Sequence, residues 1–415
     1  MPEHKKHRIR TLWFVGGLHA FTHVYQVVLL PLYFLIREDL KLESIEQATL
    51  LVTTMMLSYF IPSYGMGMLA DRLSRKRLLA FGLLLNGSAF AALAFAHTYS
   101  AALGCMVLAG LGGSFFHPSA NPLIARLFPA ETGKALGLIG IGASVGFFLG
   151  PLYAGWRAAI SGWRTPVFEL GIAGVIFALL FWYFADEEAP LQKNVIDSHP
   201  KSHSEPLFET PALWMFFLVS AFAFSLRDFT GSSMGSLGSL FLQEARGFDI
   251  QKTGFTIGFI FLASAISNPL FGSLSDRARM RWTSLVLSIA AILVVVFPRV
   301  HGNWTPVILA LYGFFFMASY PMVEAALMQS VHDSVRGRVF GLFITIGGIV
   351  GNLAHWLAGE WVKKLGAKAH IPEGYFTAYG LLALLLLASL VGLPCLHALR
   401  KKESEHFPEL AVDPT

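Results

Sequence analysis

Long apolar segments recur along nearly the whole chain, and they restrict its possible folds more than any other feature. Each is about 20 residues long, enough to cross about 30 Å of hydrocarbon as a helix. Helices also satisfy their own backbone hydrogen bonds in lipid, which an open sheet does not. The pattern predicts an all-α membrane protein with about twelve transmembrane helices. The expected spans are residues 11–36, 47–70, 78–97, 101–127, 135–157, 166–185, 212–243, 252–275, 282–299, 304–331, 339–362 and 373–400.

The composition agrees with a chain surrounded by lipid. Of 415 residues, 54% are hydrophobic and 14% are charged, whereas soluble domains average about 25% charged residues. The basic N-terminus resembles the start of a signal peptide, but no small-residue cleavage site follows, so we expect the first helix to be retained. Cys105 and Cys395 both lie inside apolar segments, and we interpret them as packing residues.

The distribution of basic residues predicts the orientation. Most of the 31 Lys and Arg residues fall in one alternating set of loops, which includes both ends of the chain. Cytoplasmic loops of membrane proteins are enriched in Lys and Arg. We therefore expect a multi-pass protein of the cell inner (plasma) membrane with both termini cytoplasmic. The basic residues are not gathered into a groove with interleaved aromatics, so no nucleic-acid partner is expected.

One long polar stretch, residues 186–211, interrupts the apolar pattern. It opens with three consecutive acids and continues with His, Ser, Pro and Lys, a composition that buries too little apolar surface to fold. We interpret it as a cytoplasmic linker. The predicted organisation is an N-terminal six-helix bundle over residues 1–185 and a C-terminal six-helix bundle with a short cytoplasmic tail over residues 212–415.

The two predicted halves share landmarks, which indicates an internal duplication. Three short motifs of the first half recur 203 to 205 residues later, each at the same topological position. Duplicated halves related by an axis along the membrane normal are a known plan of secondary transporters. The motif pairs are Asp71-Arg72 with Asp276-Arg277, His117-Pro118 with Tyr320-Pro321, and Gly133-Lys134 with Gly337-Arg338.

The loop after the second span resembles the cytoplasmic signature of the major facilitator superfamily, except that Ser74 stands where a glycine is usual. An acid at a helix end can bind a neighbouring helix N-terminus or an arginine. The resemblance implies a conformational latch that does not contact substrate, with a degraded copy in the second half. The alternative is a basic loop that only sets topology. The latch residues are Gly67, Asp71, Arg72, Arg75, Asp276 and Arg277.

The fifth span carries glycines four residues apart, which form a smooth ridge for close helix approach, and a proline that bends the helix. It resembles the antiporter-type glycine–proline motif of exporting superfamily members. Ordinary small-residue packing is the alternative. The helix-packing residues are Gly142, Gly146, Gly150 and Pro151.

A finer resemblance, to the fosmidomycin-resistance branch of the superfamily, is concentrated in the N-terminal half. It rests on the segment from Gly110 to Pro118, on His19 and Gln26 in the first span, and on Gly150-Pro151. Two positions depart from that branch: Ser119 stands where an acid is usual, and His23 where an aspartate is usual. The coupling residues and the substrate therefore need not be those of the branch.

Polar residues at membrane depth are the candidate functional residues, because an ionisable side chain near the bilayer centre costs about 2.5–3.5 kcal/mol. His19 and His23 share one face of the first span, and His117 and Asn121 share one face of the fourth. We expect the two faces to meet. The alternative is that these histidines are core residues bonded to backbone or hydroxyl groups.

Histidines four residues apart also suggest a metal site. However, spans one and four contain no Asp or Glu, and no cysteine lies close by in the sequence. We therefore expect no metal site.

In the C-terminal half, Arg227 and Asp228 interrupt the seventh span, and Glu324 follows Tyr320 by one turn in the tenth. Adjacent residues point about 100° apart on a helix, so Arg227 and Asp228 are poorly placed to pair only with each other. We expect Arg227 to meet Glu324 or an anionic substrate. The alternative is a permanently paired structural cluster. His355 lies in the eleventh span.

The predicted substrate- and proton-binding residues come from both halves. Glu324 and Asp228 are the expected proton carriers, and Arg227 is their ion-pair partner or an anion ligand. The full set is His19, His23, Gln26, His117, Asn121, Arg227, Asp228, Tyr320, Glu324 and His355.

The sequence thus predicts a secondary active transporter, a proton-coupled exporter (antiporter) of a small organic compound or drug that works by alternating access. Proton-coupled uptake (symport) of a polar metabolite is the alternative. A metal-ion transporter is less favoured, because the spans with the histidines contain no acid and no cysteine lies close to the histidines in the sequence, and an intramembrane enzyme is less favoured, because no catalytic motif is found. We expect no enzyme activity, no cofactor and a monomer, with a small-molecule substrate, protons and the lipid bilayer as partners.

Overall fold

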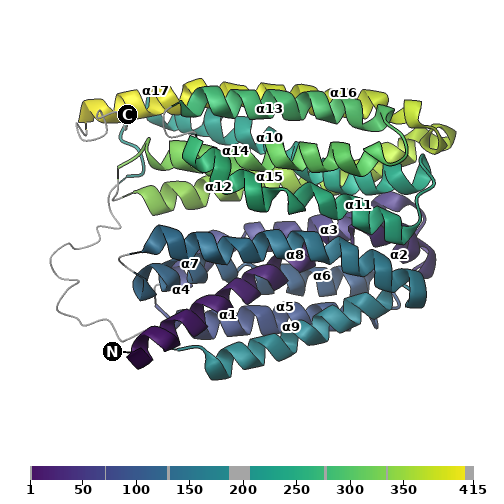
Figure 1. Ribbon diagram of the computed structural model, residues 1–415, viewed down its shortest axis with the longest axis horizontal. Coiled ribbons are helices and arrows are strands. Elements are labelled where there is room, and N and C mark those ends of the chain that lie inside the picture. Colours follow the sequence, from purple (N-terminus) through teal and green to yellow (C-terminus); the bar gives the residue numbers. More distant parts are fainter. Residues whose placement is uncertain are drawn as a thin grey trace.

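The computed structural model describes residues 2–70, 72–128, 131–186, 206–274, 278–332 and 335–406. Within these ranges every regular element is a helix, and most helices run side by side along the long axis of the molecule (Figure 1). Eleven helical segments are long and apolar enough to cross a membrane. The predicted all-α membrane fold is therefore confirmed.

The second of the twelve predicted spans is not among these eleven, because a break divides it into two separate helices of 16 and 8 residues, each too short to cross alone. It consists of α3 (Ile45–Phe60) and α4 (Ser63–Ala70). Pro62 lies in the break between them. Proline has no backbone N–H to donate and its ring clashes with the preceding turn of a helix, so a shortened α3 is the expected result.

The first half of the chain contributes nine helices. A short 3-10 turn, Leu30–Leu32, joins the first two, with Pro31 inside it. The predicted fourth span is also divided, into α6 and α7. The helices besides α3 and α4 are α1 (Pro2–Val27), α2 (Tyr33–Asp39), α5 (Arg75–Leu93), α6 (Tyr99–Gly113), α7 (Phe116–Leu127), α8 (Thr132–Ser161) and α9 (Arg164–Phe184).

The second half contributes eight helices, two pairs of which divide a predicted span. Short 3-10 turns follow several of them at the end remote from the chain termini. The helices are α10 (Pro211–Glu244), α11 (Ile250–Leu262), α12 (Ser264–Leu274), α13 (Arg279–Val296), α14 (Trp304–Met328), α15 (Arg336–Leu365), α16 (Phe376–Ala388) and α17 (Gly392–His406).

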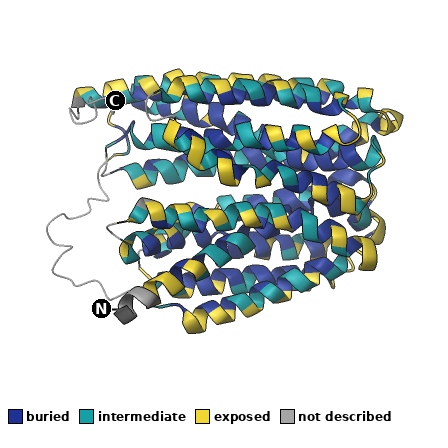
Figure 2. Cartoon of the chain, viewed as in Figure 1, coloured by how far each residue is buried: buried dark blue, intermediate teal, exposed yellow. Residues whose placement is uncertain are grey.

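The helices pack mainly within each half. Helix α1 packs against α8 and α5 against α9, while α10 packs against α15 and α13 against α14. The two halves lie one above the other in Figure 1, with both chain termini at the same end. Exposed residues lie along the outward helix faces (Figure 2), and they include large apolar side chains such as Phe95, Ile160, Tyr183 and Leu384. Soluble monomers rarely expose so much apolar surface, so these faces fit a lipid environment.

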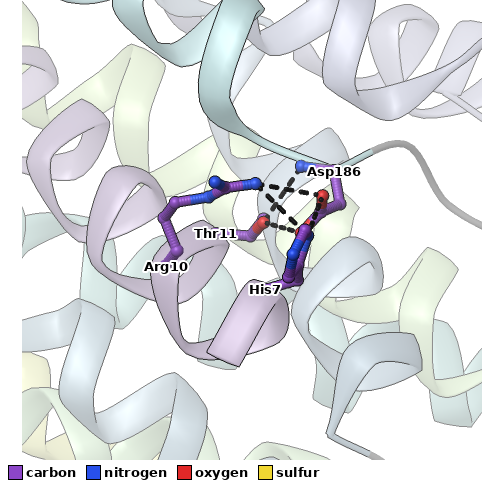
Figure 3. A network of polar contacts seen from close by, with 4 residues as sticks. All are labelled: His7, Arg10, Thr11 and Asp186. Atoms are coloured by element: carbon purple, nitrogen blue, oxygen red, sulfur yellow. Dashed lines mark hydrogen bonds and ion pairs between the residues drawn. The ribbon is translucent and has the colours of Figure 1, made fainter. Parts of the chain in front are cut away.

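A polar network ties the start of α1 to the end of α9 (Figure 3). The Asp186 carboxylate accepts hydrogen bonds from Arg10 Nη2 at 3.3 Å and Thr11 Oγ1 at 3.2 Å, and His7 Nδ1 lies 3.2 Å from it. The backbone N–H of Asp186 donates back to Thr11 Oγ1 at 3.1 Å. Residues 187–205 lie outside the described part of the chain, so the division into two bundles and a linker stays a prediction.

Between the halves, α3 packs on α15 and α8 packs on α11. Much of this contact lies at the end remote from the termini. Gly359 of α15 leaves no room for a side chain against Glu46 and Thr49 of α3, and Gly254 of α11 does the same against the Pro151 carbonyl of α8. Thr53, which is 1% exposed, donates to the Asn352 carbonyl at 2.9 Å and accepts from the Trp356 N–H at 3.0 Å.

We expect Thr53→Val to lower stability by about 1–2 kcal/mol, because the backbone groups of Asn352 and Trp356 lose a buried partner. A fall of a few degrees in the thermal midpoint of the purified protein would show this. Thr53→Ser keeps the hydroxyl and is the control. Equal midpoints for the Val variant and the native protein would mean that α15 closes its own helical bond there without loss.

Candidate functional site

Three histidines from two helices form the first polar cluster. His19 and His23 of α1 and His117 of α7 each offer one ring nitrogen, and these three atoms lie within 4.8 Å of one another. His19 and His23 are buried. The predicted meeting of the two helix faces is thus found for His117. Asn121, one turn further along α7, is exposed, and the described part of the chain shows no hydrogen bond from it to the cluster.

Hydrogen bonds orient two of the three rings. The Nδ1–H of His19 donates to the Ile139 carbonyl of α8 at 2.8 Å; because a carbonyl only accepts, this nitrogen carries the proton. Nδ1 of His23 lies 2.8 Å from Gln26 Oε1. The remaining Nε2 atoms of His19 and His23 face each other at 3.0 Å. Gln26 therefore belongs to the cluster.

The glycine ridge of α8 allows this arrangement. A side-chain carbon at Gly142 would overlap with the Gly16 carbonyl of α1 and lie 3.3 Å from His19 Cβ, and one at Gly146 would overlap with the Ala20 carbonyl. At Gly150 it would lie 3.1 Å from the Val24 carbonyl oxygen. The backbones of α1 and α8 thus lie close together, which brings the Ile139 carbonyl within reach of His19.

The second cluster lies in the C-terminal half, on α10 and α14. Arg227 is 2% exposed, and its Nε and Nη2 donate to Asp228 Oδ1 at 3.0 and 2.9 Å. The guanidinium carbon lies 3.9 Å from the centre of the Tyr320 ring. Glu324 is close enough to interact with the charges of Arg227 and Asp228. However, the described residues show no hydrogen bond or ion pair to its carboxylate.

Adjacent residues were expected to be poorly placed to pair only with each other, yet Arg227 and Asp228 do bind each other, while the Arg227 guanidinium also lies over the Tyr320 ring. The 100° rule describes where the Cα–Cβ bonds point, but an arginine side chain has four rotatable bonds and reaches back along its own helix. The predicted direct meeting of Arg227 with Glu324 is not found among the described residues.

Sequence reasoning missed two glycines that hold this cluster. A side-chain carbon at Gly347 of α15 would lie 2.6 Å from Asp228 Oδ2, and one at Gly351 would lie 2.8 Å from Asp228 Cβ. Gly347 and Gly351 follow Gly142 and Gly146 by 205 residues. The offset that relates the halves was therefore the signal that could have identified them.

His355 lies apart from both clusters, in a contact between the halves. Its Nδ1 is 2.7 Å from Ser236 Oγ, which in turn is 2.7 Å from the Tyr33 hydroxyl of α2. Its Nε2 is 3.1 Å from Asn352 Oδ1. This chain of hydrogen bonds joins the C-terminal half to the N-terminal half.

An ion pair that was not predicted lies in the same contact. Lys363 Nζ of α15 is 2.6 Å from Glu46 Oε1 of α3, and Glu46 is 7% exposed. Both residues stand at helix ends, where the sequence alone does not distinguish a partner in another helix from lipid headgroups or water.

The predicted latch is only partly described. Gly67 lies in α4, and a side-chain carbon there would come within 3.9 Å of Pro118. Arg72 is exposed and Arg75 is buried at the start of α5. Ser74, at the position where a glycine is usual, accepts a hydrogen bond from the Arg77 N–H and caps α5. Asp71, Asp276 and Arg277 lie outside the described residues, so the latch stays a prediction.

A bundle of long apolar helices with buried ionisable side chains is typical of membrane transport proteins. The family comparison agrees: residues 12–355 match the Major Facilitator Superfamily. The chain belongs to this superfamily of transporters, whose members are generally not enzymes. It is thus a multi-pass membrane transporter of a small molecule.

Relatives with similar sequences share one name. The chain is 29% identical over 340 residues to multidrug resistance protein MdtG of Yersinia enterocolitica, covering 77% of this chain and 76% of that protein. It is 26% identical over 389 residues to MdtG of Proteus mirabilis, covering 90% and 92%. These matches do not single out the fosmidomycin-resistance branch, which stays a prediction.

Solved structures of transporters share the fold. One is a bacterial homologue of the human lysosomal transporter Spinster in an inward-facing, unoccupied conformation, with a TM-score of 0.71, 18% identity and coverage of 97% of this chain and 98% of that one. Another is the nucleoside transporter NupG, with a TM-score of 0.73, 13% identity and coverage of 93% and 99%.

Proposed function

We propose that this protein is a proton-coupled exporter of small, drug-like organic compounds and acts as a monomer in the inner membrane with both termini cytoplasmic. The cluster of the buried Arg227 with the partly buried Asp228, Tyr320 and Glu324 is the observation that carries this proposal. The name of the MdtG relatives supports a drug-like substrate, and fosmidomycin belongs among the compounds to test.

The state of Glu324 supports exchange of substrate for proton. Arg227 already binds Asp228, whereas the Glu324 carboxylate has no hydrogen-bond partner among the described residues. A proton or a positively charged group of the substrate therefore compete for the same carboxylate. Since each excludes the other, loading with one releases the other, which is the requirement for antiport.

The same cluster gives the alternative, symport, with a different substrate. Arg227 Nη1 is buried and has no hydrogen-bond partner among the residues that the structure describes. Protonation of Asp228 weakens its hold on Arg227 and frees the guanidinium for an anionic group. A proton then promotes binding of an anion, and the two move together. Cationic substrates thus favour export and anionic substrates favour uptake.

We propose that the two halves rock against each other about these clusters. When the halves rock, the contacts of α3 with α15 and of α8 with α11 separate. The Glu46–Lys363 ion pair between the halves breaks at the same time. The predicted latch, which includes Gly67, Arg72 and Arg75, acts at the opposite end of the helices from these contacts.

The test is the internal pH of proteoliposomes held at zero membrane potential while a candidate substrate is added outside. We expect a cationic drug to make the lumen more alkaline, because substrate enters as protons leave. Glu324→Gln keeps the shape of the side chain but removes its charge, and we expect it to abolish the pH change. Glu131→Gln is the control, because Glu131 is an exposed acid outside the clusters.

Acidification of the lumen on substrate addition would mean that protons enter together with the substrate. The protein would then be a symporter and the proposal of export would be wrong. Uptake of radiolabelled substrate without any pH change would rule out coupling to protons. An unchanged signal in Glu324→Gln would assign the proton to another residue, with Asp228 next to be tested.

A further inference from the structure

We propose that His19, His23 and His117 form a binding site for a divalent transition-metal cation of the zinc type. Three imidazole ligands with a fourth, open position are a known arrangement for zinc sites that accept water or another ligand. The sequence predicted that His117 meets the face of His19 and His23 but led us to expect no metal site; the proposal arises because the structure brings three imidazole nitrogens together. This inference goes beyond the proposed function, because cation binding is measurable whether or not a drug is transported.

The hydrogen bonds prepare two of the rings as metal ligands. His19 Nδ1 carries its proton toward the Ile139 carbonyl, so its Nε2 has a free lone pair. With Gln26 Oε1 as acceptor, His23 Nδ1 is also protonated, and its Nε2 has a free lone pair too. These two lone pairs face each other at 3.0 Å, an arrangement that repels unless a cation lies between or beside them.

These partners match the surroundings of known metal-binding histidines. Such histidines donate their other ring N–H to a carbonyl or carboxylate, which fixes the ring and raises its basicity. Ile139 and Gln26 provide that second contact here. Aromatic rings restrict the same imidazoles further: Phe116 stacks on His19 with ring centres 4.6 Å apart, and Phe147 packs on His23 at 4.1 Å.

The distances require only a small adjustment. Tetrahedral zinc with Zn–N bonds of about 2.0–2.1 Å places its nitrogen ligands about 3.3 Å apart. The His19–His23 pair is already at 3.0 Å. The three ligand atoms lie within 4.8 Å of one another, so His117 must approach by at most about 1.5 Å to complete a tetrahedral set.

The ligand chemistry predicts which cations bind. Imidazole nitrogens suit Zn²⁺, Co²⁺ and Ni²⁺, whereas Mg²⁺ and Ca²⁺ prefer oxygen ligands. No carboxylate of a described residue is part of the cluster. We therefore expect Zn²⁺ and Co²⁺ to bind and Mg²⁺ to be ignored.

The competing arrangement is a hydrogen-bonded network without metal. If the Gln26 amide is reversed, its N–H donates to His23 Nδ1, and the Nε2–H of His23 then donates to His19. Gln26→Glu separates the two arrangements, because a carboxylate only accepts: it holds the proton of the neutral His23 ring on Nδ1 and so leaves Nε2 free for a cation. We expect this variant to bind zinc at least as tightly as the native protein.

The experiment uses the full-length protein, purified through a tag without histidine and stripped with a chelator. Zn²⁺ is titrated against a chromogenic chelator, and Co²⁺ binding is followed by visible absorption. We expect the native protein to bind one Zn²⁺ per chain and to give a strong tetrahedral Co²⁺ spectrum. We expect His23→Gln and His117→Gln each to bind Zn²⁺ about tenfold or more weakly. His97→Gln is the matched control, because His97 is exposed and lies outside the cluster.

The site would be overturned if the native protein bound no stoichiometric Zn²⁺, or if His23→Gln and His117→Gln left the binding unchanged. A weak, octahedral Co²⁺ spectrum in the native protein would do the same without any variant. A monodisperse elution profile and an unchanged metal-free thermal midpoint show that the variants are folded. Failure of drug transport leaves these results unaffected, so the two proposals are tested separately.

Discussion

Arg227→Met is expected to lower the yield of folded protein severely. The protein that does fold should have a thermal midpoint well below that of the native protein. Asp228 would then keep its charge without a partner, packed between α10 and the glycines Gly347 and Gly351 of α15. Removing one member of a buried ion pair costs about 3–5 kcal/mol, a large part of the total stability of a typical domain. The measurement is the yield of monodisperse protein and its thermal midpoint.

The double variant Arg227→Met, Asp228→Leu is the control, because it removes both charges at once. Leucine has the same branched shape as aspartate, and buried ion pairs are often replaced by apolar groups without loss. We expect most of the stability to return while substrate-driven proton movement stays absent. If the double variant still exchanged protons for substrate, the pair would be structural and coupling would rest on Glu324 alone. An Arg227→Met variant as stable as the native protein would mean that Asp228 is neutral there.

The sequence predicted the class of fold because lipid leaves few alternatives. Only helices and closed barrels satisfy their backbone in hydrocarbon, so twenty-residue apolar segments are enough to predict helical spans. Helix breaks were harder to predict. Pro62 ends α3, whereas Pro151 and Pro321 lie inside the continuous helices α8 and α14, because neighbouring helices decide whether a proline-containing turn can be accommodated.

The sequence predicted correctly those neighbours in the candidate site that lie on one helix at helical spacing. It failed for neighbours whose contact depends on how helices and side chains pack. The i, i+4 spacing placed His19 beside His23, as the structure has them. The same spacing placed Asn121 beside His117, yet only His117 reaches the cluster, because the spacing gives direction but not the distance to the facing helix. The Arg227–Asp228 pair depends on side-chain reach, which a helical wheel ignores.

Gly146→Ala is expected to destabilise the protein by up to about 2 kcal/mol, although alanine is the better helix former. The added carbon would overlap with the Ala20 carbonyl, and since this is backbone, α1 and α8 must move apart. Overpacking of this kind costs about 1–3 kcal/mol. The separation also weakens the His19–Ile139 hydrogen bond, so the variant should bind Zn²⁺ less tightly if the histidines form the proposed site.

Gly140→Ala on the same helix is the matched control. No atom lies within 4 Å of the carbon it adds, so only the helix propensity remains, which favours alanine by about 1 kcal/mol. The two substitutions are chemically identical and lie less than two turns apart, yet their effects on the thermal midpoint should have opposite signs. If Gly146→Ala were as stable as Gly140→Ala, the glycine ridge would not hold α1 against α8, and the orientation of His19 would need another cause.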